Sequence, residues 1–559
     1  MEKMSSMRTY IFRTTGILVL TLLAFPRELP AQEKIEKEVR VVKAYEPTLS
    51  GATKIRVSPE ADDTLTLRPD FEYTIYPRPL QYRRGVRPIQ AARMESDVLP
   101  ELYGSYLRLG FGSYTTPMGE LSISSRRNRN GMLSLYINHM SSQGKVKLDN
   151  EQKVFAGYSD TRIDIDGKKI FRNATWKGHA GFDALTRYFY GHSPDTLAEP
   201  GKDDIRQRYL LFDAGTEILS THGDSSRLNY KLGVDYGYTQ DLYSNRQHAF
   251  RFAGSGFTSF VKGIAGMDLQ VDHYRRVPET ASGNNTLVSV FPWWMKNTPE
   301  YRLQLGLNVT VDHGTSQWWH FYPTAMLQFR VIEKILIPYL GVRGYVKAND
   351  LRKVAMENPF IIPGLTVKNS DHNMEFYGGI KGNMGSHVAF TLRASYALVN
   401  NAYFFVNDTI TELSNQFDVV YDDLEEVNYY GELLFRVADR WDVLLKGNYY
   451  QHTTAVEEKA WHRYQYDGTL SVKYNLRDKI LVSADLLAYG PRWARSWDPV
   501  ADPIHLKVYL DMNLGVEYRY TKILSGFVTL NNLAAARYQA WNQYPMQRFF
   551  ILFGFSYSL

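Results

Sequence analysis

The chain has 559 residues, with 65 lysines and arginines against 59 aspartates and glutamates, and it contains no cysteine. The lack of cysteine excludes a lipid-anchored lipoprotein, a disulfide framework and a thiolate metal site. The net charge of +6, without a basic helix or a zinc-ligand pattern, gives no sign of nucleic-acid binding. Tyrosine is frequent, with 40 residues, and mean hydropathy is −0.35. A membrane β-barrel has this composition, and so does a secreted tyrosine-rich sandwich or propeller.

Residues 1–31 have the pattern of a secretory signal peptide. Lys3, Arg8 and Arg13 give a positive start, residues 16–25 form an apolar run, and Pro30-Ala31 lies at the small-residue exit. The run is too short for a membrane helix, which needs about 20 apolar residues. The mature protein is therefore expected to be exported.

Residues 32–100 form a proline-rich segment that holds seven of the 23 prolines. Because proline lacks a donor for a strand ladder, this segment is predicted to be a periplasmic or partial-plug extension, not barrel wall. It carries basic residues with no acid among them: Arg78, Arg83, Arg84, Arg87 and Arg93. These residues belong to a solvated linker, or to a luminal segment that pairs with inward carboxylates such as Asp511 and Glu517 or meets an anionic substrate.

From Leu102 onward the sequence alternates between apolar and polar residues, the period-2 pattern of strands. The pattern is clear over residues 227–238, 301–312 and 506–520. The third of these runs has a polar face of Lys507, Asp511, Asn513, Glu517 and Arg519. A charged side chain facing lipid at mid-bilayer costs roughly 2–4 kcal/mol, so such faces are predicted to line a hydrated interior. Residues 101–559 are predicted to form an all-β, antiparallel transmembrane barrel.

Short connections alternate with longer, more variable loops along this region. The short ones lie near residues 128–131, 173, 222–225, 262–263, 297–298, 333–334, 383–386, 439–440, 475–477 and 521–522. The largest loops are expected near residues 349–371, 403–424 and 491–503. Short periplasmic turns opposite longer outer loops are typical of outer-membrane barrels, and the count gives about 22 strands. Trp293-Trp294 and Trp318-Trp319 fall at opposite strand ends, where aromatic girdles lie, although ordinary wall positions explain them nearly as well.

The last eleven residues, 549–559, form an amphipathic strand that is predicted to close the barrel. Phe549, Ile551, Phe553, Phe555, Tyr557 and Leu559 share one face, and Gly554, Ser556 and Ser558 share the other. Phe550 and Leu552 are exceptions at the start of the second face. Since no residue follows to cover an edge, the strand is expected to pair within a closed sheet.

One stretch, residues 394–435, lacks lysine and arginine and gathers carboxylates. They are Asp408, Glu412, Asp418, Asp422, Asp423, Glu425 and Glu426. Much of the stretch is predicted to be an outer loop, where carboxylates bind Ca²⁺ or ions that bridge surface lipids, or are simply solvated; their spacing matches no calcium loop. The sequence has no G-x-S-x-G or H-E-x-x-H motif, so neither catalytic activity nor a cofactor or metal site is expected.

Several stretches resemble TonB-dependent receptors. The segment Leu530-Asn531-Asn532-Leu533, with Tyr538, Tyr544-Pro545 and Arg548, resembles their closing hairpin, while residues 43–49, 109–117 and 139–144 are similar to a Gram-negative subgroup labelled TonB-dependent receptor-like. The resemblance implies a 22-stranded outer-membrane barrel that moves a ligand inward with energy from TonB. Two departures stand out. Residues 32–100 are too short for the folded plug of such receptors, and Leu559 replaces the usual terminal aromatic residue.

Within this resemblance, Glu38-Val39-Arg40-Val41-Val42 is similar to a TonB box, which would bind by adding a strand to the partner's sheet. Any short valine-rich strand has the same pattern. The expected partners are outer-membrane lipids, TonB or another periplasmic protein through residues 32–100, and the barrel-assembly machinery through the C-terminal strand.

The expected function is transport or uptake of a ligand across the bacterial outer membrane. One alternative is a non-transporting barrel that scaffolds an outer-membrane complex. Another is a channel for hydrophobic compounds with a short N-terminal hatch, which requires about 14 longer strands.

Overall fold

The wall of the molecule is one sheet of 22 antiparallel strands, counted over the part of the chain that the structure describes. The structure is a computed structural model that describes residues 104–125, 128, 130–192, 200–221, 227–278, 284–313, 319–409, 411, 413–437, 440–498 and 501–558. The chain divides into two units, Met1–Glu95 and Ser96–Leu559, and the described residues belong to the second. The predicted signal peptide (1–31) and proline-rich segment (32–100) lie outside the described residues.

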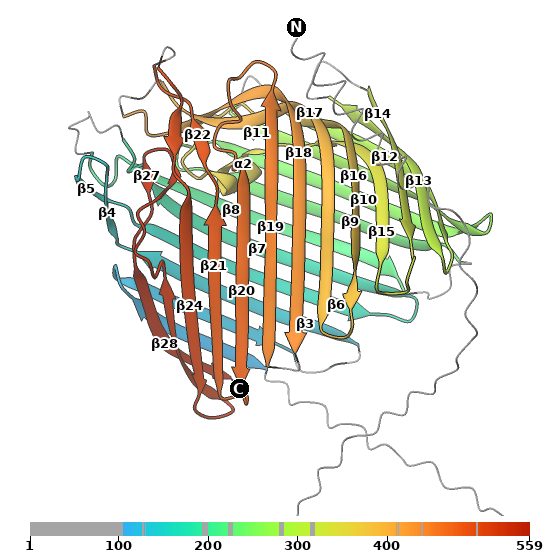
Figure 1. The fold of residues 1–559 in the computed structure, drawn as a ribbon, viewed down its shortest axis with the longest axis horizontal. Coiled ribbons are helices and arrows are strands. Elements are labelled where there is room, and N and C mark those ends of the chain that lie inside the picture. Colours follow the sequence, from blue (N-terminus) through green and yellow to red (C-terminus); the bar gives the residue numbers. More distant parts are fainter. Residues whose placement is uncertain are drawn as a thin grey trace, which may run out of the picture. The chain divides into compact units, whose positions relative to one another are not determined.

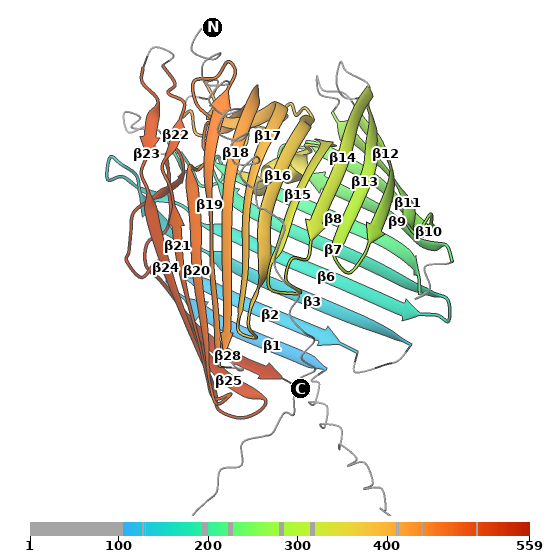
Figure 2. The same cartoon turned by 45° about the vertical axis from the view of Figure 1, so that its right-hand side comes forward.

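Each wall strand pairs with the next wall strand along the chain, so the sheet is a simple meander (Figures 1 and 2). The wall strands are β1 (Ser105–Gly112), β2 (Thr116–Ser124), β3 (Gly131–Ser142), β6 (Tyr158–Ile170), β7 (Ala174–Tyr188), β8 (Arg206–Ser220), β9 (Asn229–Gln240), β10 (Arg246–Phe260), β11 (Gly263–Val277), β12 (Asn285–Asn297), β13 (Tyr301–Asp312), β14 (Trp319–Phe329), β15 (Ile337–Lys347), β16 (Ser370–Met384), β17 (Val388–Asn407), β18 (Phe417–Val437), β19 (Trp441–Thr454), β20 (Tyr466–Leu476), β21 (Ile480–Tyr489), β24 (Tyr509–Arg519), β25 (Leu524–Asn531) and β28 (Phe550–Ser558).

The barrel closes at a seam where β1 pairs with β28, from Tyr106 opposite Ser558 to Gly112 opposite Leu552. Gly110 faces Gly554 in this register. A Cβ atom at Gly554 would lie 2.0 Å from the Leu109 carbonyl oxygen, so only glycine fits there. The closed sheet confirms the predicted barrel of about 22 strands. It excludes the sandwich, the propeller and the channel of about 14 strands.

The two faces of the wall alternate as the sequence predicts. On β28, Phe553 and Phe555 are 55% and 46% exposed on the outer face, while Ser556 is buried on the inner face. Phe550 and Leu552, the exceptions in the pattern, face inward and pack with Phe527 of β25 in a luminal apolar cluster. The outer face is therefore apolar and suited to lipid, and the inner face is mostly polar.

The two ends of the barrel differ as predicted. The expected short turns fall between consecutive wall strands at one end, which is also where β1 begins and β28 ends, while residues 222–225 lie outside the described residues. The longer loops lie at the other end (Figure 1). Trp293 and Trp294 lie near the short-turn end of β12, and Trp319 begins β14 at the loop end, whereas Trp318 is outside the described residues.

Two predicted boundaries are wrong. The loop expected near residues 403–424 is mostly strand, because β17 continues to Asn407 and β18 begins at Phe417. The strand expected from Leu506 begins at Tyr509, so Lys507 is not part of its polar face. Leu506 instead belongs to a small hairpin within a loop.

The long loops contain small elements of their own. They hold three hairpins and the helix α2, whose bounds are β4 (Lys145–Lys147), β5 (Lys153–Phe155), β22 (Arg492–Ala494), β23 (Ile504–Leu506), β26 (Gln539–Trp541), β27 (Tyr544–Pro545) and α2 (Leu351–Glu357). Across the described ranges, no helix is both long and apolar enough to cross a membrane.

Candidate functional site

The loops pack together across the mouth of the barrel into an apolar core, here called the loop core. Its buried residues come from the loops β3–β6, β7–β8, β15–β16, β17–β18 and β25–β28 and from the adjoining strand ends. They are Val146, Leu148, Ala156, Phe189, Tyr190, Ile205, Tyr209, Leu351, Val354, Ala355, Phe360, Ile361, Leu365, Val367, Tyr403, Phe405, Phe417, Val419 and Tyr544. Burying this much apolar surface is the main stabilisation open to long loops.

Tyr544, from the β25–β28 loop, lies at the centre of the loop core and has no exposed surface. Its ring stacks on Phe360 with centroids 3.9 Å apart and meets Tyr190 edge-on at 4.9 Å. Its hydroxyl donates to the Asn415 carbonyl oxygen, and burial raises the pKa of this phenol well above its usual value. The polar end of the ring is thus satisfied inside an apolar cluster, as a buried tyrosine requires.

Hydrogen bonds join loops from opposite sides of the barrel. The Asn415 side chain, next to β18, donates to the Phe189 carbonyl oxygen, which follows β7, at 2.6 Å. The Tyr209 hydroxyl on β8 donates to the Pro359 carbonyl oxygen at 3.1 Å. In the ring of 22 strands, β8 and β18 are ten positions apart, which is almost half of the ring. The loop core therefore extends across the mouth of the barrel and is not confined to its rim.

Helix α2 connects the loop core to the barrel wall. Asp350 caps it by accepting a hydrogen bond from the Lys353 amide, and Val354 is buried in the core. On its polar side, Arg352 donates to Asp213 of β8 at 2.7 Å and lies 3.7 Å from Asp183 of β7. A seven-residue helix is marginal alone, so its contacts hold it in place.

A second set of contacts ties the β19–β20 loop to the loop core. His462 is buried there, with its Nδ1 atom 2.9 Å from the Phe405 carbonyl oxygen and its Nε2 atom 3.4 Å from the Asn542 amide nitrogen. The carbonyl requires that Nδ1 donates, and Nε2 then accepts. Desolvation lowers the pKa of His462 to about 3, which keeps the ring neutral.

The inner wall carries charges of both signs. On β6 to β9 the carboxylates Asp164, Asp183, Asp213 and Asp235 gather, and Arg162, Arg352 and His179 lie within 4 Å of members of this group. On the other side, near the short-turn end, basic side chains dominate a cavity of about 700 Å³. A solute in the lumen therefore meets a polar interior.

The site residues proposed from the sequence fall partly outside the structure. The segment similar to a TonB box (Glu38, Val39, Val41, Val42) and the basic residues Arg78, Arg83, Arg84, Arg87 and Arg93 lie outside the described residues. The inward carboxylates named as their partners have partners of their own. Asp511 accepts from the Tyr538 hydroxyl at 2.9 Å, and Glu517 lies 4.0 Å from Arg519.

The acidic stretch serves the loops themselves. Asp422 is buried and accepts from the amides of Val456 and Glu457, while Asp408 accepts from the amides of Thr411 and Gln416. Among the described residues, no group of three or more His, Asp or Glu side chains is placed to hold a metal ion. Asp408 and Asp422 therefore fasten turns, whereas Glu425 and Glu426 contact Tyr396 and His452 of the wall, and Glu412 lies outside the described residues.

Sequence reasoning missed the loop core. Phe360 and Tyr544 lie in segments without periodicity, and no local pattern shows that they meet. The aromatic residues of the β17 and β18 ends, such as Phe405 and Phe417, were a usable signal, because solvated loops rarely contain such runs.

Comparison with known proteins gives a fold and not a sequence family. No family model matches the chain, and no curated protein matches it. Solved structures do match. The siderophore receptor PirA from Acinetobacter baumannii aligns with a TM-score of 0.62 at 12% identity, over 83% of this chain and 81% of that one.

Two further structures align with slightly lower scores. The ferric-catecholate import receptor Fiu from E. coli K12 gives a TM-score of 0.60 at 10% identity, over 82% of both chains. The copper transporter OprC gives 0.60 at 11% identity, also over 82% of both. These neighbours are import receptors and a transporter, not enzymes. The resemblance to the barrel of TonB-dependent receptors is confirmed at the level of the fold.

Proposed function

We propose that this protein takes up a ligand across the outer membrane through its lumen, with energy supplied by TonB. The observation that carries the proposal is a closed 22-stranded wall, apolar outside and charged inside, whose outer mouth is covered by the loop core. The fold is shared with import receptors of known structure. In this proposal the lumen is the path, the loop core is the outer gate, and residues 32–100 are a partial plug.

A second candidate is a barrel that does not transport but scaffolds an outer-membrane complex. The same loop core favours it, because interlocked loops across the mouth provide a stable surface and obstruct passage. In this case residues 32–100 would hold a periplasmic partner.

Conductance in planar bilayers separates the two candidates. We compare the full chain, a variant that lacks residues 32–100, and a combined variant that also carries Tyr544→Ala. The matched control carries Val456→Ala in place of Tyr544→Ala, because Val456 is 88% exposed. A conduit predicts that the combined variant conducts and that the control does not. A barrel that stays closed in the combined variant contradicts transport. A stoichiometric partner that copurifies with the full chain, and is lost with residues 32–100, supports the scaffold.

The powered form of the proposal rests on residues 38–42. Val41→Pro removes an amide donor from the strand that would add to TonB, so binding of a purified TonB C-terminal domain should be lost. Ile55→Pro, outside this segment, is the control and should leave binding intact. Unchanged binding by Val41→Pro would refute the TonB box.

Export and assembly complete the proposal. We expect signal-peptide cleavage near Ala31, which N-terminal sequencing of the mature protein checks. We also propose that β28 is the strand that the barrel-assembly machinery recognises, since it is amphipathic and closes the sheet.

A further inference from the structure

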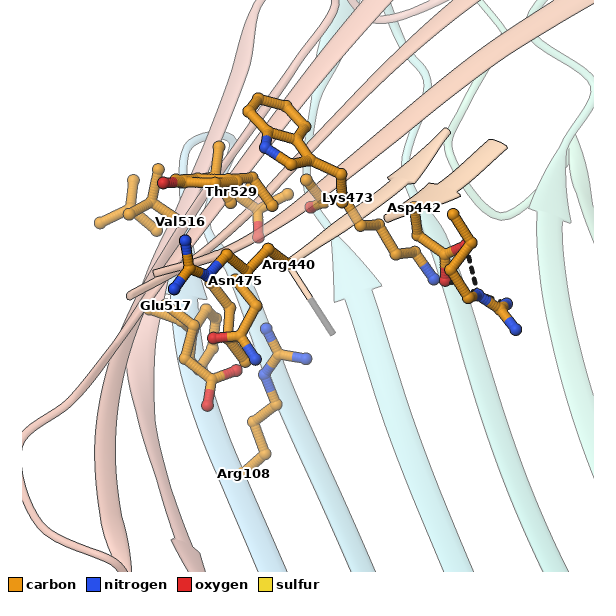
Figure 3. A pocket seen from close by; sticks show the side chains of 17 residues that line it. Arg108, Arg440, Asp442, Lys473, Asn475, Val516, Glu517 and Thr529 are labelled. Atoms are coloured by element: carbon orange, nitrogen blue, oxygen red, sulfur yellow. Dashed lines mark hydrogen bonds and ion pairs between the residues drawn. The ribbon is translucent and has the colours of Figure 1, made fainter. Parts of the chain in front are cut away.

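A cavity of about 700 Å³ lies on the luminal side of the wall at the short-turn end. Its lining comes from β1, β18 to β21, β24 and β25 and from the turn before β19, and Figure 3 shows Arg108, Arg440, Lys473 and Glu517 around it. Arg108 faces the lumen because it pairs in register with Ser556, a residue of the inner face. The volume is that of a small-molecule site, and the loop core lies at the opposite end of the barrel.

The charges of this cavity do not balance. Among the described lining residues, four are basic (Arg108, Arg436, Arg440, Lys473) and two are acidic (Asp442, Glu517). Asp442 is held by Arg436 through two hydrogen bonds of 3.0 and 3.2 Å, one of which is marked in Figure 3, and Glu517 lies 4.0 Å from Arg519. Both acids are therefore engaged by other arginines.

The remaining cations form no ion pair with a described residue, although Glu120 lies opposite Arg108 and Asp442 lies opposite Lys473 in the strand register. No hydrogen bond or ion pair joins the side chains of Arg108, Arg440 or Lys473 to a described residue. The Arg108 guanidinium lies 3.8 Å above the centroid of the Phe527 ring, and its Nε atom is buried without a partner. A cation–π contact holds the group in place but leaves its in-plane donors free for a ligand.

We propose that this cavity binds a small polyanionic solute, one that carries two or more phosphate or carboxylate groups. Three cations, from β1, from β20 and from the turn between β18 and β19, match such a ligand. A guanidinium donates in a fixed fork to an oxyanion, and an ammonium adds a point charge. The hydroxyl of Thr529, also in the lining, supplies a neutral donor. This inference stands apart from the proposed function, because binding at the short-turn end requires neither TonB nor passage through the loop core.

The test is calorimetric titration of the full chain in detergent micelles with pyrophosphate and, separately, with citrate at low ionic strength. Saturable binding of either probe with a stoichiometry near one, weakening as salt rises, is the expected result. Binding of neither probe overturns the proposal.

Variants locate the site. Arg108→Gln and Lys473→Gln should each weaken binding at least tenfold, whereas Lys473→Arg should retain most of it. Lys231→Gln is the matched control, because Lys231 lies on the acidic wall, 2.7 Å from Glu217. Equal affinity in Lys473→Gln and the unmodified chain refutes the assignment. Heat-dependent mobility on a gel confirms that each barrel is folded. If Arg108→Gln disturbs the seam, Lys473→Gln alone decides.

The outcome is separable from that of the transport proposal. Lys473→Gln is also introduced into the combined variant, which lacks residues 32–100 and carries Tyr544→Ala, to measure conductance. TonB binding by residues 38–42 is measured on Lys473→Gln in the full chain. Loss of polyanion binding in Lys473→Gln, with those two properties unchanged, supports the site whatever the barrel transports.

Discussion

The rings of Phe360 and Tyr544 stack 3.9 Å apart at the centre of the loop core, although one precedes β16 and the other precedes β28. Their contact joins the loops from two distant parts of the wall. Because both rings are buried against further aromatics, including Tyr190, the pair fixes several loops at once.

Tyr544→Ala should loosen the loop core. Replacing a large buried aromatic residue by alanine typically costs about 3–5 kcal/mol, and here the loss falls on the contacts between loops rather than on the wall ladder. We expect protease cleavage in the outer loops while heat-dependent gel mobility of the barrel is retained. Val456→Ala, at an exposed loop position, should be cleaved no faster than the unmodified chain. Equal resistance in Tyr544→Ala would show that the core does not depend on this ring.

Reversing the charge at Arg352 should detach α2 from the wall. In the unmodified chain Asp213 and Asp183 attract Arg352. The substitution Arg352→Asp places a third carboxylate against these two, so attraction becomes repulsion. The partly exposed pair contributes about 1 kcal/mol or less, so the added repulsion is the larger effect. The measurement is cleavage within residues 351–357. Adding Asp213→Arg should restore protection, and failure of the double variant to recover would argue against a direct pairing.

Acid should weaken the loop core through His462. Its folded pKa of about 3 lies below the unfolded value of 6.5, so the unfolded loop binds a proton first as the pH falls. Stability is therefore full above pH 6.5 and declines between 6.5 and 3, by about 2.7 kcal/mol at pH 4.5, at 1.36 kcal/mol for each pH unit. Urea titrations of loop protease resistance at pH 7 and pH 4.5 measure this loss. His462→Gln should flatten the dependence, and an unaltered slope would assign it to other groups.

Neighbouring positions on β13 should respond oppositely to arginine. Leu305 is 44% exposed on the outer face, and Gln304 belongs to the luminal face. Leu305→Arg should cost roughly 2–4 kcal/mol near mid-bilayer, whereas Gln304→Arg adds a cation to a hydrated interior. Folding yield into lipid vesicles, followed by gel mobility, compares the two. Similar yields would mean that the assignment of the faces is wrong on this strand.

The barrel wall was predictable because its cause is local. Alternation along β13 and β28 follows from lipid on one side and water on the other, and a turn must interrupt it at regular intervals. Even so, the turn before β11 is Val261-Lys262, with φ of 44° and 55°, and a β-branched residue is unusual in that left-handed region. Only the ends of the flanking strands indicated it.

The loop core was not predictable because its cause is long-range. Asp418 and Asp422 indicated a solvated loop, yet both belong to β18. Asp422 is buried and accepts hydrogen bonds from the amides of Val456 and Glu457. Similarly, Arg108 of β1 and Lys473 of β20 line one luminal cavity because the seam joins β1 to β28. The spacing of residues in the sequence does not predict such long-range contacts.

The glycine pair at the seam has a consequence for biogenesis. Until Gly110 and Gly554 come together, β1 and β28 each present a row of unpaired amides and carbonyls, a template for any other strand. A nascent sheet can therefore pair with other strands at both edges, and the lack of a side chain at Gly554 lets the backbone of β1 approach closely enough to close the barrel. Closure of the sheet on itself therefore depends on glycine at a single position of the last strand.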